Sequence, residues 1–304
     1  MSKNVFLFSG QGSQYVGMAK ELYDSCEGAK EIFRKASEVL GYDLCEIVFN
    51  GPDTELNKTI YSQPAIMACS LSAFEAVKEK GITFDGVAGH SLGEYAAMVA
   101  SGVVSVEDGF KLIKARAEAM QEAAEKNAGA MCAVLKLTAE EIEKVCEETE
   151  GYVVAVNYNS PAQTVIAGEV EAVDKAIETF TSMKARCMKL NVASAFHSKM
   201  MESAAEKFIE TAKTVTFNTP TVEFYSNVIG KKLEAFSDMP SLLARHIVSP
   251  VKFTSELSEM DEAGYDTFIE LGPKNVLAGL VKKTLSDKAV FNVENLKTLE
   301  TLVL

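Results

Sequence analysis

The chain has 304 residues, of which 47% are apolar, so it can bury a large core as one big domain or as a large and a small one. Its 43 acidic and 30 basic side chains give a formal charge of −13, which disfavours nucleic-acid binding, because that requires clustered Lys and Arg. The six cysteines are scattered without a C-x-x-C pair. This argues against a disulfide framework or a metal site and predicts free thiols in a reducing compartment.

The first apolar segment, Val5–Phe8, is short and runs directly into a glycine loop. A secretory signal has a longer apolar stretch, so this segment is expected to be the first strand of a sheet. No apolar run in the sequence approaches the length that spans a bilayer. We therefore expect a cytoplasmic protein that does not bind membranes.

Strand and helix patterns alternate along residues 1–127. After Val5–Phe8, a helix is expected over Pro64–Lys80, because proline suits a first helical position. A short apolar strand over 84–88 and an apolar helix over 92–100 follow. A capping pattern then predicts a long helix over 105–126. Strands separated by helices predict a mostly parallel sheet that is covered on both faces.

The order of expected elements changes near residue 128. It becomes β-α-β-β-α-β, which is the order of a ferredoxin-like unit. We therefore expect a discontinuous large α/β domain over 1–127 and 195–304, and a small domain inserted over 128–194. The elements of the inserted unit are expected as strands over 130–137, 152–157, 163–167 and 186–192 and helices over 138–149 and 170–180.

The segment Gly89–Gly93 matches the pattern G-x-S-x-G, in which a serine lies on a tight turn between a strand and a helix. The two glycines allow the turn to be tight and the helix to lie against its strand. An ordinary glycine-rich turn is the alternative. Because a strand is expected before the turn and a helix after it, we interpret Ser91 as a nucleophile.

A serine hydroxyl needs a base that takes its proton, and the sequence offers three histidines. His90 adjoins the serine, where the backbone should point its ring away. His197 lies between an expected strand and an expected helix, and it follows the serine in chain order as in the α/β-hydrolases. We favour His197 as the base over a packing role at a domain junction, and His246 remains a second candidate.

Arg116 falls at the edge of the apolar sector of its expected helix. A guanidinium keeps its charge, so one that faces inward needs an anion. The residues alone leave two interpretations equal: a structural pair with a buried Asp or Glu, and a clamp on a substrate carboxylate.

The segment Gly10–Gly12 resembles a phosphate loop but lacks the third glycine of a dinucleotide motif and the G-K-[ST] of a P-loop. A glycine loop at a strand end can instead direct a backbone N–H at a developing oxyanion. The N–H of Leu92, directly after the nucleophile, would be the second donor.

Taken together, several segments of this sequence resemble the malonyl-CoA:acyl-carrier-protein transacylases of fatty-acid synthesis. Their joint occurrence is specific, although no single motif is. The resemblance implies a hydrolase-like α/β core with an inserted ferredoxin-like subdomain, the layout that the order of strands and helices predicts separately. The matching segments cover almost the full length: Phe8–Gln14, Gln63–Ala65, Gly89–Glu94, Arg116, Met120–Gln121, Asn159–Gln163, Phe196–Ser198 and Leu271–Pro273.

The resemblance implies a role for each polar candidate. Ser91 would carry the acyl group, and His197 would be its base, steered by a main-chain carbonyl instead of an acid. His246 stands where many members have Gln or Asn, and it would contribute that carbonyl. Arg116 would hold the free carboxylate of malonate.

The resemblance also implies how the pocket is built. The backbone N–H groups of Gln11 and Leu92 would form the oxyanion hole, and Gln63 would line the pocket. Phe196 looks like the version of its position that selects malonyl groups. Lys274 departs from the family, in which this part of the chain usually reads G-P-G-K.

The implied reaction moves a malonyl group from malonyl-CoA to Ser91 and then to the pantetheine thiol of acyl carrier protein, without cofactor or metal. A discrete acyltransferase of a polyketide assembly line would have the same site. A serine thioesterase or esterase would use water as acceptor and would need an acid beside His197, for which Glu94 and Asp266 are candidates. A subunit that only binds acyl carriers is the non-enzymatic alternative.

Overall fold

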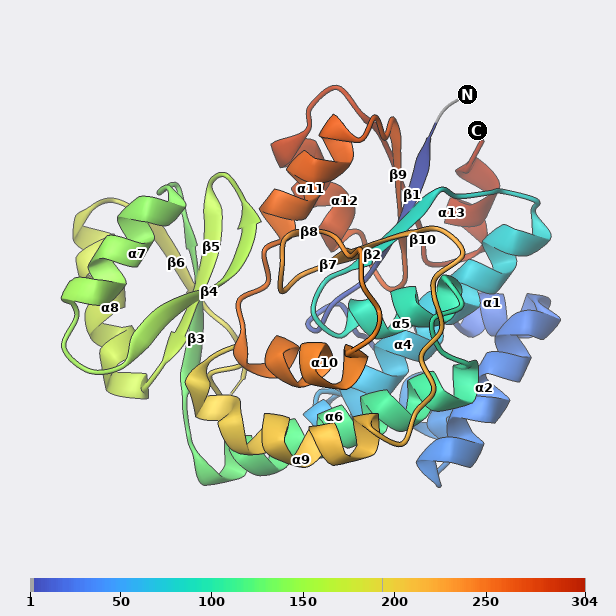
Figure 1. The fold of residues 1–304 in the computed structure, drawn as a ribbon, viewed down its shortest axis with the longest axis horizontal. Coiled ribbons are helices and arrows are strands. Elements are labelled where there is room, and N and C mark those ends of the chain that lie inside the picture. The colour runs from blue at the N-terminus through green and yellow to red at the C-terminus, as the bar shows by residue number, and fades with distance from the viewer. Residues whose placement is uncertain (1–2, 193, 304) are drawn as a thin grey trace.

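The computed structural model of the chain describes residues 3–192 and 194–303. Residues 1–2, 193 and 304, which the expected domain ranges include, lie outside the described residues. A large α/β body carries a smaller β-sheet unit at one side (Figure 1). The six strands of the large sheet are, in spatial order, β10 (Ala289–Val293), β9 (Thr267–Leu271), β1 (Asn4–Phe8), β2 (Gly86–Gly89), β7 (Glu223–Ser226) and β8 (Lys231–Lys232).

All neighbouring strands of the large sheet are parallel except β8, which is antiparallel to β7. The sequence of β1 reads as one apolar run because both faces of this central strand are covered. Phe6 and Phe8 pack into the core on one face, and Val5 and Leu7 pack into the core on the other. The predicted mostly parallel α/β fold is confirmed, and it places the carboxyl ends of β1 and β2 side by side.

Helices cover both faces of the large sheet. The cluster that contains Phe253, Leu257, Leu277 and Val281 fills the space between one face and two helices, α11 (Phe253–Glu262) and α12 (Val276–Thr284). The helices that contribute to the larger core on the other face are α1 (Lys20–Ser25), α2 (Glu27–Leu40), α4 (Thr59–Glu79), α5 (Gly93–Ala100), α6 (Val106–Lys126), α9 (Glu202–Ala212) and α10 (Met239–Val248).

Short elements complete the large body. They fill the connections before α4, before α9 and after β10. They are a π-helical turn (Glu46–Asn50), α3 (Asp53–Leu56), a 3-10 turn (Lys199–Met201) and α13 (Leu296–Thr301).

The expected start of a helix at Pro64 is wrong, because α4 begins at Thr59 and contains Pro64 in its interior. Proline has no N–H for the carbonyl four residues earlier, so the oxygen of Ile60 needs another donor. The hydroxyl of Tyr42 points to that oxygen at 3.5 Å. The structure therefore tolerates the proline through a tertiary contact that the sequence does not reveal.

The helix that carries Arg116 follows the prediction. The hydroxyl of Ser105 accepts a hydrogen bond from the N–H of Asp108 at 3.0 Å, which caps the start of α6. Arg116 lies within the buried sector of this helix and not on its solvent side. The apolar periodicity of this segment thus correctly predicts that the charged side chain of Arg116 faces the interior.

The small unit consists of a four-stranded antiparallel sheet with its own core, and the predicted β-α-β-β-α-β order is confirmed. We propose that it forms the subdomain over 128–194, inserted between 1–127 and 195–304. Its strands in spatial order are β4 (Val153–Ser160), β5 (Gln163–Gly168), β3 (Ala130–Leu135) and β6 (Arg186–Lys189), and its helices are α7 (Ala139–Glu148) and α8 (Val170–Ser182).

The strand expected over 186–192 ends early, at Lys189. Leu190 still donates a backbone hydrogen bond to Met131 at 2.9 Å, but the N–H of Val192 then turns back to the carbonyl of Leu190. The chain leaves the sheet here because it must cross to the large body. Residues 190–192 consequently face the cavity between the two units.

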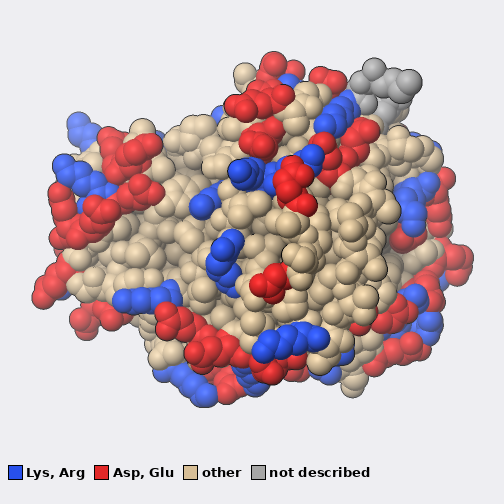
Figure 2. All heavy atoms as spheres, viewed as in Figure 1, with Lys and Arg blue, Asp and Glu red and all other residues tan. Residues whose placement is uncertain are grey.

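Charged side chains of both signs are interspersed on the face drawn in Figure 2. Many of the ion pairs join residues three or four apart on one helix, such as Arg34 with Glu31 at 2.6 Å. Exposed pairs of this kind contribute only about 0.3–0.5 kcal/mol each. All six cysteines are free thiols, and none of the described helices has the length and apolarity needed to cross a bilayer.

Candidate active site

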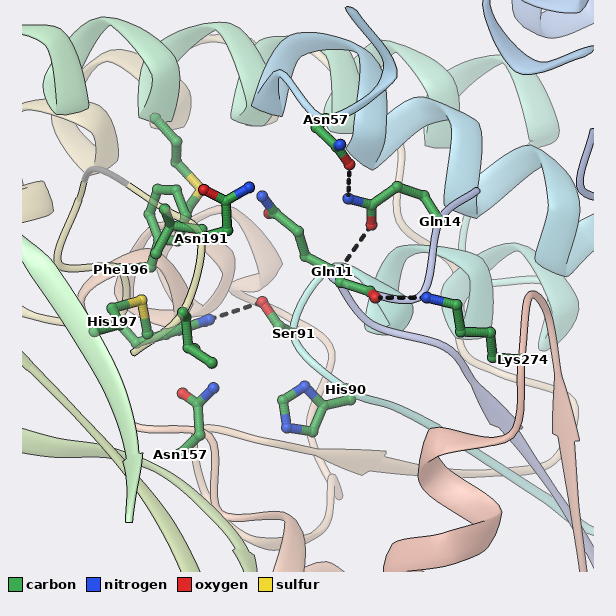
Figure 3. A pocket seen from close by; sticks show the side chains of 15 residues that line it. Gln11, Gln14, Asn57, His90, Ser91, Asn157, Asn191, Phe196, His197 and Lys274 are labelled. Carbon is green, nitrogen blue, oxygen red and sulfur yellow. Dashed lines mark hydrogen bonds between the residues drawn. The ribbon is translucent and has the colours of Figure 1, made fainter. Parts of the chain in front are cut away.

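Ser91 lies on the tight turn between β2 and α5, where its side chain faces an open cavity (Figure 3). Its φ of 55° is in the left-handed region, which costs a non-glycine residue roughly 1–2 kcal/mol. A Cβ atom on Gly89 would lie 2.0 Å from the carbonyl carbon of Gly93. A Cβ atom on Gly93 would lie 2.1 Å from the carbonyl oxygen of Phe8. The two glycines of the motif are therefore required by the close contact of strand and helix.

His197 is the histidine that contacts Ser91. The Ser91 hydroxyl donates to Nε2 of His197 at 2.7 Å, and both side chains are buried. Nδ1 of His197 lies 3.0 Å from the carbonyl oxygen of His246 and 3.1 Å from that of Ser249. Because carbonyl oxygens only accept, the ring proton is on Nδ1, and the lone pair of Nε2 faces the serine.

The two carboxyl groups considered as a third partner of His197 lie elsewhere. Glu94 is buried and has Oε2 at 3.1 Å from Nε2 of His246. Asp266 precedes β9 and pairs through its backbone with Lys3, at the opposite end of the sheet from Ser91. Two main-chain carbonyls take the place that an acid would occupy, and Ser249 is one that sequence reasoning missed.

The other two histidines have different partners. Nε2 of His90 lies 2.8 Å from Oδ1 of Asn159, and its ring stacks edge-on against Phe253. The ring of His246 is fully buried and faces Asn227 and Glu94. The geometry therefore favours His197 over His246 as the base.

Arg116 is completely buried and contacts Ser91. Nη2 donates to the Ser91 hydroxyl at 3.1 Å, and Nη1 donates to Oε1 of Gln63 at 2.8 Å. Its Nε has no hydrogen-bond partner, and no ion pair joins Arg116 to a carboxylate in the described part of the chain. Burial lowers the pKa of Arg116, so an anion beside it is favoured. These contacts favour the clamp over the structural pair.

Gln63 was expected to line the cavity, but it contacts Arg116 and is not among the residues that line it. Its side chain is fully buried, with Oε1 on the guanidinium and Nε2 3.6 Å from the sulfur of Met120. Because Gln63 lies on α4 and Arg116 on α6, the packing of two helices fixes this contact. Arg116 is equally buried and does not line the cavity either, but it contacts the Ser91 hydroxyl, which does.

The backbone N–H groups of Gln11 and Leu92 donate to no protein acceptor within the described residues. The N–H of Ser91, by contrast, donates to Oδ1 of Asn227 at 2.7 Å. Two free donors beside a nucleophilic hydroxyl are the arrangement expected of an oxyanion hole.

The loop that carries Gln11 is held from two sides. The N–H of Gly12 donates to Oε1 of Gln14 at 2.8 Å, and Nζ of Lys274 donates to the carbonyl of Gly12 at 3.3 Å. Lys274 has a φ of 64°, the left-handed conformation that glycine adopts readily. Lys274, where the family usually has glycine, thus adopts a backbone conformation that would be less strained for glycine.

The cavity has a volume of about 420 Å³ and lies between the large body and the small unit. Figure 3 shows Ser91 and His197 joined by a hydrogen bond, with the side chains of Asn157 and His90 near them. No group of His, Cys, Asp and Glu among the described residues could hold a metal ion. The lining residues are Gln11, Gly12, Gln14, Asn57, His90, Ser91, Met120, Met131, Asn157, Leu190, Asn191, Val192, Phe196, His197 and Lys274.

The electrostatics of the site keep His197 neutral. Burial, followed by the positive charge of Arg116, lowers the pKa of His197 from its usual value to about 3. A depressed pKa means that the imidazole stays unprotonated as the pH falls through 6.5, where an ordinary histidine would gain its proton.

We therefore expect that titration of His197 does not change the rate of Ser91 acylation between about pH 5 and pH 8. Quenched-flow measurement of the acyl-enzyme over this range, on protein whose circular dichroism is unchanged, checks the expectation. A rate that falls tenfold per pH unit below 6.5 would contradict it.

Comparison with known proteins identifies the family to which the chain belongs. Residues 5–302 match the family model of the acyl transferase domain. The chain is 39% identical to the malonyl CoA-acyl carrier protein transacylase of Bacillus subtilis (strain 168) over 307 aligned positions, which cover 100% of this chain and 97% of the relative.

Two solved structures are similar over nearly their whole length. The malonyl CoA-acyl carrier protein transacylase from Clostridium perfringens ATCC 13124 has a TM-score of 0.94 at 42% identity, covering 98% of this chain and 95% of that one. A malonyl-transacylase in complex with its type II PKS acyl-carrier protein has a TM-score of 0.94 at 36% identity, covering 99% and 98%. The chain therefore belongs to the malonyl-CoA:acyl-carrier-protein transacylase family.

Proposed function

We propose that this protein transfers a malonyl group from malonyl-CoA to the pantetheine thiol of acyl carrier protein through an acyl-serine intermediate. The observation that carries the proposal is the position of one buried hydroxyl. Ser91 Oγ lies 2.7 Å from the base His197 and 3.1 Å from the cation Arg116. His197 activates this oxygen as a nucleophile. Arg116 provides a positive charge that binds the carboxylate of the malonyl group.

In the first half-reaction, Nε2 of His197 takes the proton of Ser91 as Oγ attacks the thioester carbonyl carbon. The developing oxyanion is stabilised by the free N–H groups of Gln11 and Leu92. The carbon–sulfur bond then breaks, and the imidazolium returns its proton to the CoA thiolate. The carbonyls of His246 and Ser249 accept from Nδ1 throughout and thus hold the ring in place.

In the second half-reaction, His197 takes the proton of the pantetheine thiol, and the thiolate attacks the malonyl ester of Ser91. The same donors stabilise the second oxyanion, and the serine leaves with the proton that His197 returns. The malonate carboxylate replaces the Ser91 hydroxyl as the partner of Arg116, which fixes the acyl group for both steps.

The similar structure solved with a carrier protein supports a thiol acceptor over water. No specific contact favours water as the acceptor, since neither Glu94 nor Asp266 faces His197. A carrier from a polyketide assembly line and one from fatty-acid synthesis present the same pantetheine thiol, so both are acceptors to be compared.

The test isolates the malonyl-enzyme and offers it different acceptors. Wild-type protein is mixed with malonyl-CoA, and intact mass is measured after removal of CoA. We expect holo carrier protein to remove the malonyl group at least roughly 100-fold faster than buffer does, because the site positions a thiol and not a water. Equal rates with and without carrier would identify a thioesterase, and the absence of any adduct would identify a binding subunit.

A further inference from the structure

Asn227 follows β7 directly and lies under the turn that carries Ser91, with none of its surface exposed. Its Oδ1 accepts from the N–H of Ser91 at 2.7 Å. Its Nδ2 donates to the carbonyl of Gly89 at 2.7 Å and to the two carboxyl oxygens of Glu256 at 3.0 and 3.1 Å. Because a backbone N–H only donates and a carbonyl only accepts, the orientation of this amide is determined.

The same amide oxygen contacts the ring of His246. Nε2 of His246 lies 3.2 Å from Oδ1 of Asn227, which can only accept, so this nitrogen carries the ring proton. Oε2 of Glu94 lies 3.1 Å from the same nitrogen and shares the proton. Nδ1 of this ring has no hydrogen-bond partner among the described atoms, as expected for a neutral imidazole with its single proton on Nε2.

The His246 ring belongs to the residue that steers the base. The backbone carbonyl of His246 accepts from Nδ1 of His197 at 3.0 Å. Asn227 is thus linked to the nucleophile through one hydrogen bond and to the base through the His246 residue. It touches neither the Ser91 hydroxyl nor the reacting nitrogen of His197.

We propose that Asn227 is a positioning residue that sets the separation of Ser91 and His197, with the His246 ring as its link to the base. Oδ1 of Asn227 accepts from the backbone N–H of Ser91 and from the ring of His246, whose carbonyl steers His197. This shared acceptor couples the position of Ser91 to that of His197. Glu256 and Gly89 fix the amide itself. The inference rests on the proposed function, because it concerns the same two reacting groups.

The first experiment measures acylation of Ser91 in the Asn227→Ala variant by quenched intact mass at several malonyl-CoA concentrations. We expect the limiting rate to fall about 100-fold, while the concentration for half-maximal rate changes less than about threefold, because the substrate contacts remain. A folded variant whose limiting rate is within about threefold of wild type would overturn the proposal. Wild type that forms no adduct would instead reject the proposed function.

Tyr265→Phe is the matched control for lost stability. Its buried hydroxyl donates to Glu223 at 2.9 Å, away from the cavity. We expect this variant to unfold at a lower temperature and to keep the wild-type acylation rate. Slower acylation in Tyr265→Phe would show that general destabilisation explains the effect, and would overturn the proposal.

A second pair of variants decides the question even where Asn227→Ala does not fold. His246→Leu and His246→Gln both keep the backbone carbonyl, but only glutamine keeps a side-chain N–H donor. We expect His246→Leu to acylate at least about tenfold more slowly than His246→Gln, since it alone loses the buried donor. Equal acylation rates in the two variants would show that the His246 ring does not position His197, and would overturn the proposal.

Discussion

Replacement of Ser91 by alanine is expected to abolish the malonyl adduct and to reduce malonyl transfer at least about 10⁴-fold. The hydroxyl supplies the atom that becomes esterified, and no other side chain shares its contacts with His197 and Arg116 in the described part of the chain. Alanine tolerates the φ of 55° no worse than serine does, so the fold should persist. Intact mass after incubation with malonyl-CoA gives the measurement.

Ser72→Ala is the control for loss of a buried serine hydroxyl. Ser72 is fully buried on α4 and donates to the carbonyl of Ala68 at 2.8 Å, outside the cavity. We expect this variant to form the malonyl adduct at the wild-type rate. An adduct that persists in Ser91→Ala would place the nucleophile elsewhere and would reject the proposed mechanism.

Replacement of Arg116 by alanine is expected to lower kcat/KM about 10³-fold for malonyl-CoA and less than about tenfold for acetyl-CoA. The reason is the carboxylate, which only the malonyl group has. Removing one partner of a buried charge pair costs about 3–5 kcal/mol, and each 1.4 kcal/mol is a factor of ten. Acetyl-CoA loses only the contact of Nη2 with Ser91 Oγ, which is 3.1 Å long.

Two further variants separate charge from geometry. Arg116→Lys keeps a positive charge but cannot hold Gln63 and a carboxylate at once, so its loss for malonyl-CoA should be intermediate. Lys114→Ala removes a cation on the same helix that contacts the carbonyl of Leu40 at 2.9 Å, and it should leave both substrates unaffected. Equal losses for malonyl-CoA and acetyl-CoA in Arg116→Ala would refute the clamp.

The local elements of the fold could be predicted because short-range rules govern them. The cap at Ser105, the cap at Thr138 and the contact of Gly89 with Gly93 each depend on residues within four positions of one another. Pro64 shows the limit of such rules. Its missing hydrogen bond is compensated by Tyr42, which is distant in sequence, and no local pattern contains that information.

The candidate site could be predicted only in part. Ser91, His197 and Arg116 have side chains whose chemistry is distinctive, so a motif or an out-of-place charge identifies them. Asn227 and Ser249 carry an amide and a carbonyl that occur throughout any chain, and nothing in their sequence setting distinguishes them. Their contacts with Ser91 and His197 depend on the pairing of β7 with β2 and on where α10 packs in the large body.

The sequence by itself determined the β-α-β-β-α-β order of the small unit, the position of Ser91 on a tight turn between a strand and a helix, and the presence of a charge inside α6. Only the tertiary structure decided that the carbonyl of Ser249 also contacts Nδ1 of His197, that Gln63 contacts Arg116 and that Glu94 pairs with His246. The physical reason is distance along the chain. Hydrophobic periodicity and capping act within a few residues, whereas hydrogen bonds between residues that are 49 or more positions apart form only once both segments are packed.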